Sequence, residues 1–194
     1  MYRQYIINRL TSALASHFHN GYEYTQVLEG TQTFLVAQSP DDIVKESFLQ
    51  NGSTLDGAIE AARYTLKKKN KLPVVLSAQH QIALIRCPST DKAGTVWLVH
   101  SHIHSTESDP THHSKTIVYT KNGHSLIIDM KPDRLQTKRT QAAFLNSTFF
   151  KNSEMNKTLT FFYEKDRGIQ LVKEKGQLNY TLKKKTNLVE LDTE

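Results

Sequence analysis

The chain has 194 residues, of which 38% are hydrophobic and 23% are charged. This length suffices for one domain with a buried core, and the composition excludes wholesale disorder. No apolar run has membrane-spanning length, polar residues interrupt the N-terminal apolar stretch that a signal peptide would need, and the single cysteine, Cys87, excludes an internal disulfide framework. We therefore expect one cytoplasmic domain over residues 1–194.

The positive charge of the chain is concentrated in a few places. Lysine and arginine outnumber acidic residues by 25 to 19, which gives a net charge of +6 and favours polyanionic partners. Three basic runs occur: KKKNK at 67–71, KPDRLQTKR at 131–139 and KKK at 183–185. A solvated helix or strand end explains any one run, but three runs in a domain of this size predict a basic surface.

The first part of the chain predicts a hairpin followed by a helix. Residues 24–38 have alternating apolar positions on either side of Glu29-Gly30, which indicates a β-hairpin. Ser39 then supplies an N-cap and Pro40 fits the first helical position. The helix is expected to end at Asn51-Gly52, where glycine can adopt the left-handed conformation.

A second helix is predicted from Ser53 to Lys67–Lys69, because its apolar residues recur every three or four positions on one face. Pro73 prevents its continuation. The following segments are predicted strands: PVVLSA at 73–78, QIALIRC at 81–87, TVWLVHSHIHS at 95–105 and KTIVYTKNGHSLIIDM at 115–130. Asn122-Gly123 divides the last segment, which predicts a hairpin with a two-residue turn.

A third helix is predicted over about residues 132–145, with Leu135, Ala142 and Leu145 on its apolar side. Its opposite side is expected to expose a stripe of Arg134, Lys138 and Gln141. Further predicted strands are TLTFFYE at 158–164, GIQLV at 168–172 and LNYTLKK at 178–184. This order of elements predicts an α+β fold, a mainly antiparallel sheet with two early helices and one later helix.

Three histidines alternate in the predicted strand at 95–105. One face of that strand would carry Val96, Leu98, His100, His102 and His104. Two histidines separated by one residue can bind zinc, and the stretch is similar to the HSHP strand of the zinc-dependent JAMM isopeptidases. A zinc-dependent hydrolase that uses His100, His102 and Asp109 is therefore one alternative.

We favour a different interpretation of the histidines, in which they lie on a sheet face that is exposed or meets DNA or a partner, with no metal and no cofactor. Ile103 replaces the proline of the isopeptidase strand, and no glutamate is placed as a general base. No nucleophile-elbow serine and no Gly-rich phosphate loop occur either. If His100 and His102 contacted DNA, binding would weaken as the pH rises through about 6–7.

Several short motifs follow one another in a fixed order through the middle of the chain. The block at 72–103 contributes Pro73, Val74, Val75, Gln81, Ile82, Ser89, Thr90, Trp97 and His102. Upstream lie Ser47, Gly52, Ser53, Thr54 and Gly57, and downstream lie the VYTKNGHSLII hairpin and Gln136, Arg139 and Thr140. In order and spacing these motifs resemble the ComK family of bacterial competence transcription factors over about residues 25–165. The ends, 1–20 and 173–194, diverge.

The resemblance implies a transcription activator, not an enzyme, that binds AT-rich promoter boxes in the minor groove as dimers and switches on genes for DNA uptake and recombination. It also implies a nucleoid location, RNA polymerase as a partner, and an adaptor that hands the protein to a Clp protease. Phe161, Phe162 and Tyr163 match the adaptor-binding segment loosely, and a plain core strand is the alternative there. Ala58, which replaces a basic residue of the family, and the divergent tail suggest another alternative, an interaction module that has lost DNA binding.

The candidate DNA-binding residues are chosen for side chains that can contact phosphates or base edges. They are Ser53 and Thr54 at the start of the second helix, Lys67, Lys68, Lys69 and Lys71 after it, His100 and His102, and Arg134, Lys138, Arg139 and Gln141 on the third helix. Free amides behind Ser53 and Thr54 could hold a phosphate, although ordinary helix capping is an equal alternative.

Overall fold

The structure is a computed structural model and describes residues 2–90, 94–155, 169–172 and 181–184. The chain divides into two compact units, Met1–Met155 and Asn156–Glu194. The prediction of a single domain over 1–194 stays a prediction. Within the described ranges, no helix combines the length and the apolar character needed to cross a bilayer.

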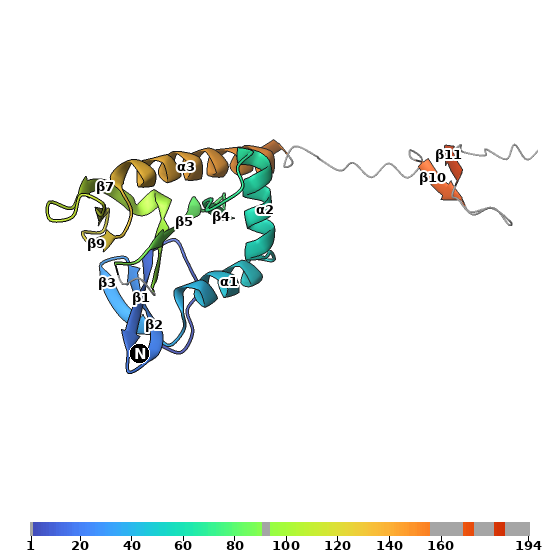
Figure 1. The fold of residues 1–194 in the computed structure, drawn as a ribbon. Helices are drawn as coiled ribbons and strands as arrows, with labels where there is room; N and C mark the ends of the chain where they lie inside the picture. Colours follow the sequence, from blue (N-terminus) through green and yellow to red (C-terminus); the bar gives the residue numbers. More distant parts are fainter. Residues whose placement is uncertain (1, 91–93, 156–168, 173–180, 185–194) are drawn as a thin grey trace, which may run out of the picture. The chain divides into compact units, whose positions relative to one another are not determined.

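A six-stranded antiparallel sheet forms the centre of the first unit, in the order β3-β2-β1-β6-β5-β4 (Figure 1). The strands are β1 (Thr11–His19), β2 (Tyr22–Glu29), β3 (Gln32–Val36), β4 (Val74–Ser77), β5 (Ile82–Pro88) and β6 (Thr95–Val99). Strands β2 and β3 confirm the predicted hairpin, which turns at Gly30 with a φ of 54°. Strand β1 was not predicted, although it lies in the middle of the sheet between β2 and β6.

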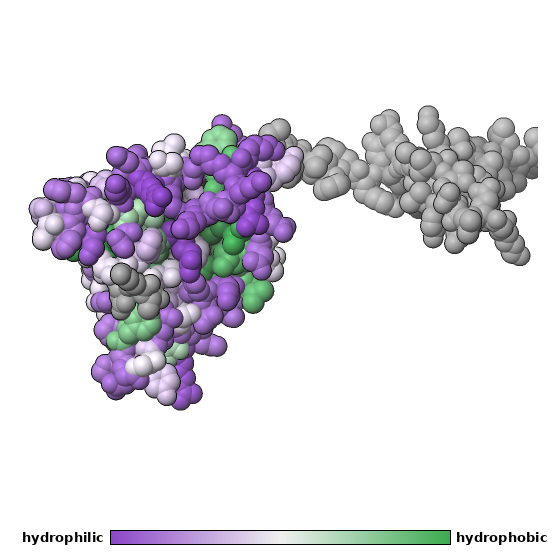
Figure 2. Space-filling view, in the orientation of Figure 1, coloured by the Kyte–Doolittle hydropathy of each residue, from purple (hydrophilic) through white to green (hydrophobic). Residues whose placement is uncertain are grey.

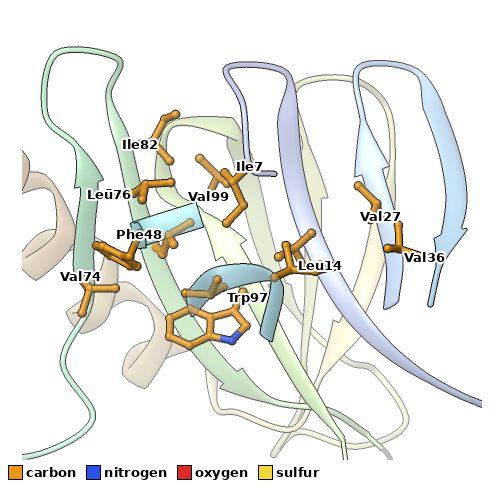
Figure 3. Packing of buried hydrophobic residues seen from close by; sticks show 13 residues of the cluster. Ile7, Leu14, Val27, Val36, Phe48, Val74, Leu76, Ile82, Trp97 and Val99 are labelled. Atoms are coloured by element: carbon orange, nitrogen blue, oxygen red, sulfur yellow. The ribbon is translucent and has the colours of Figure 1, made fainter. Parts of the chain in front are cut away.

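Helices α1 (Pro40–Gln50) and α2 (Leu55–Leu66) pack on one face of this sheet. The predicted cap of α1 forms, since Ser39 Oγ accepts a hydrogen bond from the Asp42 amide at 3.2 Å. At α2 the structure shows the capping alternative, in which Thr54 Oγ1 accepts a hydrogen bond from the Gly57 amide at 3.1 Å. Figure 3 shows the core between helices and sheet, in which Phe48 of α1 and Trp97 of β6 lie among aliphatic side chains. Burial of these side chains from both layers fixes the helices on the sheet.

The other face of the sheet is covered by α3 (Pro132–Met155) and by a three-stranded antiparallel sheet. Its strands are β7 (Ile103–Ser108), β8 (Thr116–Thr120) and β9 (Ser125–Ile128). Leu135 and Ala142 of α3 pack in the same core cluster as Ile85 and Val118, one from each sheet. Helix α3 continues to Met155 and does not end near residue 145 as predicted. The three helices and the antiparallel sheets confirm the α+β prediction.

The predicted strand over 95–105 is wrong at its centre. Strand β6 ends at Val99, the 3-10 turn η1 covers His100–His102, and β7 begins at Ile103. The four residues Val96–Val99 are all buried, because β6 is covered on both faces. The turn then takes the chain from the large sheet to the small one, so the three histidines do not share a strand face.

The second unit is described only at two strands, β10 (Ile169–Val172) and β11 (Thr181–Lys184), which pair with each other in antiparallel orientation. They confirm the predicted strands at 168–172 and 178–184. The predicted strand at 158–164, with the proposed adaptor-binding residues Phe161, Phe162 and Tyr163, lies outside the described residues.

Candidate nucleic-acid interface

Two of the three basic runs meet at one cleft of the first unit, which we call the basic cleft. It has a volume of about 790 Å³ and lies between α2, the 67–73 loop, one end of the sheet and α3. Its basic lining residues are Arg63, Lys68, Lys69, Lys71, Arg86, Arg134 and Lys138, whereas Asp129 is its one acidic lining residue in the described part of the chain. Figure 2 shows hydrophobic side chains at the surface between α2 and α3, bordered by hydrophilic ones.

A small apolar cluster explains why the 67–71 run lies beside α3. Ala62 of α2, Leu72 after the run and Leu145 of α3 are buried together, with Leu66 and Phe149 packed against them. Lys67 ends α2 in the left-handed conformation with a φ of 53° and places its ammonium 4.1 Å from the centre of the Tyr64 ring. Lys67 is therefore not a lining residue, whereas the lysines that follow it are.

Lys138 was predicted to lie on an exposed stripe of α3, but the structure buries it. Only 8% of the residue is exposed, and its ammonium donates a hydrogen bond to the backbone carbonyl of Lys71. Helix α3 packs against both the sheet and the 67–73 loop. A larger part of its surface is therefore buried than the positions of its apolar residues in the sequence predict. Arg134 is exposed as predicted, and Gln141 is half-buried.

Burial lowers the pKa of the Lys138 ammonium, the neighbouring Cys87 opposes this shift, and the positive charges of Lys71 and Arg134 lower the pKa further. The thiol of Cys87 also lines the cleft, and burial raises the pKa of that thiol to about 12. Because such a thiol stays protonated at neutral pH, it is not a negatively charged partner for the ammonium. The interior of the cleft is thus strongly electropositive.

One wall of the basic cleft is fixed by Asp41, which lies in the first turn of α1. Its carboxylate accepts hydrogen bonds from Arg86 Nη2 at 2.7 Å and from the Trp97 indole nitrogen at 2.7 Å. Arg86 also donates to Thr95 Oγ1 at 3.1 Å. Asp41 is 45 residues from Arg86 and 56 from Trp97 in the sequence, so no local signal could have shown this cluster.

The remaining candidates from the sequence lie outside the basic cleft. Thr54 caps α2 at the end opposite to the 67–71 run, and Ser53 Oγ donates to the Phe48 carbonyl at 3.4 Å. His100 lines a separate pocket of about 240 Å³ with Gln81 and Asn146. Arg139 is half-buried, and its positive charge contributes to the lowered pKa of His100, of which burial is the main cause.

Two of the three residues of the zinc-hydrolase alternative, His102 and Asp109, form hydrogen bonds with the backbone. His102 Nε2 donates to the Arg9 carbonyl at 2.9 Å. Asp109 Oδ1 accepts from the Thr111 amide at 2.8 Å and from the His112 amide at 3.2 Å, which closes a turn of the polar loop. In the part of the chain that the structure describes, no group of three His, Cys, Asp or Glu residues is placed to hold a metal ion. The geometry thus gives this alternative no support.

An α+β domain with a strongly cationic cleft has the charge distribution expected of a polyanion-binding protein. A comparison with protein-family models matches residues 2–154 to the family described as ComK protein. The match spans most of the chain, so the chain belongs to the ComK family and is a competence-related transcription factor. The resemblance found in the sequence is thereby confirmed, and the match also includes strand β1. Comparisons with curated proteins and with solved structures gave no match.

Proposed function

We propose that this protein activates genes for DNA uptake and recombination by binding AT-rich promoter duplexes. The family assignment supports the regulatory role. The observation that carries the DNA-binding part is the convergence of two basic runs, 67–71 and 131–139, on the basic cleft. Lysine and arginine side chains that displace counterions at phosphates supply most of the affinity of such proteins for DNA.

In this proposal the protein binds the minor groove as dimers on one promoter. Minor-groove contacts distinguish little beyond A·T from G·C, so the preference for AT-rich boxes comes from groove width and bendability. Narrow AT-rich grooves attract basic side chains, and Arg134 is an exposed arginine of the basic cleft.

The remaining parts of the proposal concern partners and location. The protein acts at the nucleoid in the cytoplasm together with RNA polymerase. An adaptor of a Clp protease binds Phe161, Phe162 and Tyr163. Deleting residues 156–194 tests the adaptor part: the shortened chain should persist longer in cells than the full chain.

The DNA-binding part is tested by measuring the affinity of the full chain for AT-rich and GC-rich duplexes of equal length over a series of salt concentrations. Affinity should fall steeply with salt. The double variant Lys68→Ala, Lys69→Ala should weaken binding to both duplexes by the same factor. It should also reduce the slope of log affinity against log salt concentration by about 2, because each phosphate contact contributes about 0.9 to that slope.

Lys45→Ala is the matched control, because Lys45 is exposed on α1 and lies 3.8 Å from Asp42, outside the basic cleft. It should leave the slope unchanged. An equal loss in both variants would place the DNA-binding surface elsewhere. Absence of binding even at low salt would contradict the proposal and favour an interaction module without DNA binding.

A further inference from the structure

Lys138 is a buried cation without an anionic partner in the described part of the chain. The one hydrogen bond that it makes to the described residues is donated to a neutral acceptor, the Lys71 carbonyl. No described carboxylate forms an ion pair with it. Buried charges in proteins are normally paired, because removing a charge from water is costly. An ammonium in this position is therefore expected to have a function that depends on an anion from outside the chain.

The groups around Lys138 increase the need for an anion. Arg134 lies one turn earlier on α3, Lys71 belongs to the adjacent loop, and both add positive charge. The neighbouring Cys87 thiol of β5 is neutral at ordinary pH, because its pKa is raised to about 12. Three cations, the buried Lys138 and the exposed Lys71 and Arg134, thus line the cleft close enough for their charges to interact. A phosphate can accept charge-assisted hydrogen bonds from all three.

The size and the inner wall of the cleft indicate what the anion is attached to. A volume of about 790 Å³ is within the usual range for small-molecule sites. Apolar side chains also line the cleft: Ile59 is half-buried, whereas Val74, Met130 and Trp97 belong to the core and expose only a small part of their surface to the cleft. A DNA duplex presents phosphates but keeps the faces of its bases stacked inside, so a duplex offers no flat apolar group to this part of the lining.

We propose that the basic cleft is a binding site for a mononucleotide, with the phosphate held by Lys71, Arg134 and Lys138 and the planar base against the apolar part of the lining at Ile59, close to the buried Trp97. The nucleotide is a regulator of the protein: it neutralises cations that would otherwise contact promoter phosphates, and so lowers promoter affinity. This regulatory role rests on the proposed DNA-binding function, whereas the nucleotide site itself does not.

The chain provides its own probe for this proposal, because its single tryptophan lines the cleft. The full chain is titrated with a purine mononucleotide, the corresponding nucleoside without phosphate, and inorganic phosphate. Trp97 fluorescence, corrected for ligand absorbance, is followed together with the heat of binding. The mononucleotide should saturate at one per chain, phosphate should bind at least about tenfold more weakly, and the nucleoside should bind more weakly still.

Two variants test the site. Lys138→Met and Arg134→Gln should each lower the affinity for the mononucleotide at least about tenfold, since each substitution removes a charged hydrogen-bond donor. Arg134 is exposed, so its variant reports on binding even if Lys138→Met fails to fold. Lys45→Ala should bind like the original protein. Equal affinity of all variants, or no saturable signal with the mononucleotide, would overturn the proposal.

A separate titration with duplex DNA distinguishes this proposal from the proposed function. Saturable mononucleotide binding without duplex binding would support the nucleotide site and contradict the DNA-binding function. Duplex binding without mononucleotide binding would support the DNA-binding function and contradict the nucleotide site. If both ligands bind, saturating mononucleotide should reduce duplex affinity, and unchanged duplex affinity would overturn the regulatory role.

Discussion

The imidazole Nε2 of His102 lies 2.9 Å from the backbone carbonyl oxygen of Arg9 and donates a hydrogen bond to it. His124 makes the same kind of bond to the carbonyl of Gly30, also at 2.9 Å. Arg9 lies just before β1, and Gly30 lies in the turn between β2 and β3. These two histidines therefore connect the small sheet and the turn before it to the loops of the large sheet, a role that needs no metal.

Replacing His102 with alanine is expected to lower the free energy of unfolding by about 1 kcal/mol, because the Arg9 carbonyl loses its donor and water replaces it only in part. Urea unfolding of the purified protein measures this change. His104→Ala, at an exposed position of β7, is the control and should leave stability unchanged. An unaltered unfolding curve in His102→Ala, together with loss of bound zinc, would favour the metal site instead.

His100 should make stability depend on pH in the acid range. Burial lowers its pKa, and the charges of Arg139 and Lys121 lower it further. An unfolded histidine titrates near 6.5, so below about pH 6.5 the unfolded state binds a proton more readily than the folded state and stability falls. The free energy of unfolding should therefore decrease from about pH 7 to pH 5, and His100→Gln should reduce that decrease.

Parallel urea titrations of the two proteins over this range measure the difference. Identical acid dependence would show that His100 keeps an ordinary pKa in the folded protein. The lowered pKa also bears on the expectation that DNA affinity falls as the pH rises through about 6–7. If His100 contributes to this change in affinity, the change should occur at a lower pH than for a histidine with an ordinary pKa.

The elements that could be predicted from the sequence are those with local signals. Ser39 and Asn51 mark the ends of α1, and the alternation around Gly30 marks the β2–β3 hairpin. Strand β1 has no such signal, because its first four residues, Thr11–Leu14, are all buried between two layers and show no alternation. The turn at His100–His102 is likewise determined by tertiary structure, at the point where the chain leaves one sheet for another.

The candidate site shows the same division between local and long-range information. The basic runs were visible in the sequence, but their convergence depends on the packing of Leu72 against Leu145. The burial of Lys138 could not be predicted, since helical periodicity does not show that a loop covers a second side of α3. The link from Asp41 to Arg86 joins α1 to β5, and no spacing rule connects them.

The Asp41 cluster predicts a measurable effect on both stability and fluorescence. Asp41→Ala should lower the free energy of unfolding by about 1–3 kcal/mol, because the buried indole nitrogen of Trp97 loses its acceptor. The tryptophan fluorescence spectrum of the Asp41→Ala variant should also shift, because Trp97 is the single tryptophan of the chain. Glu60→Ala removes an exposed carboxylate from α2 and should change neither property. Equal behaviour of the two variants would show that the Asp41 contacts contribute nothing.

Lys138→Met is expected to preserve the stability of the fold or to increase it by about 1 kcal/mol. The substitution removes a buried ammonium whose desolvation is uncompensated, and this gain exceeds the loss of one hydrogen bond to Lys71. Lys151→Met, at an exposed position of α3, is the control and should change stability by less than about 0.5 kcal/mol.

The sign of the pH dependence provides a second check on Lys138. Because its folded-state pKa is lowered, the original protein is penalised while the ammonium remains charged and recovers stability as the pH rises toward the unfolded value of 10.5. The advantage of Lys138→Met should therefore shrink between neutral pH and about pH 10. A variant that is clearly less stable at neutral pH would show that the ammonium stabilises the fold. In that case its burial would need no external anion to explain it.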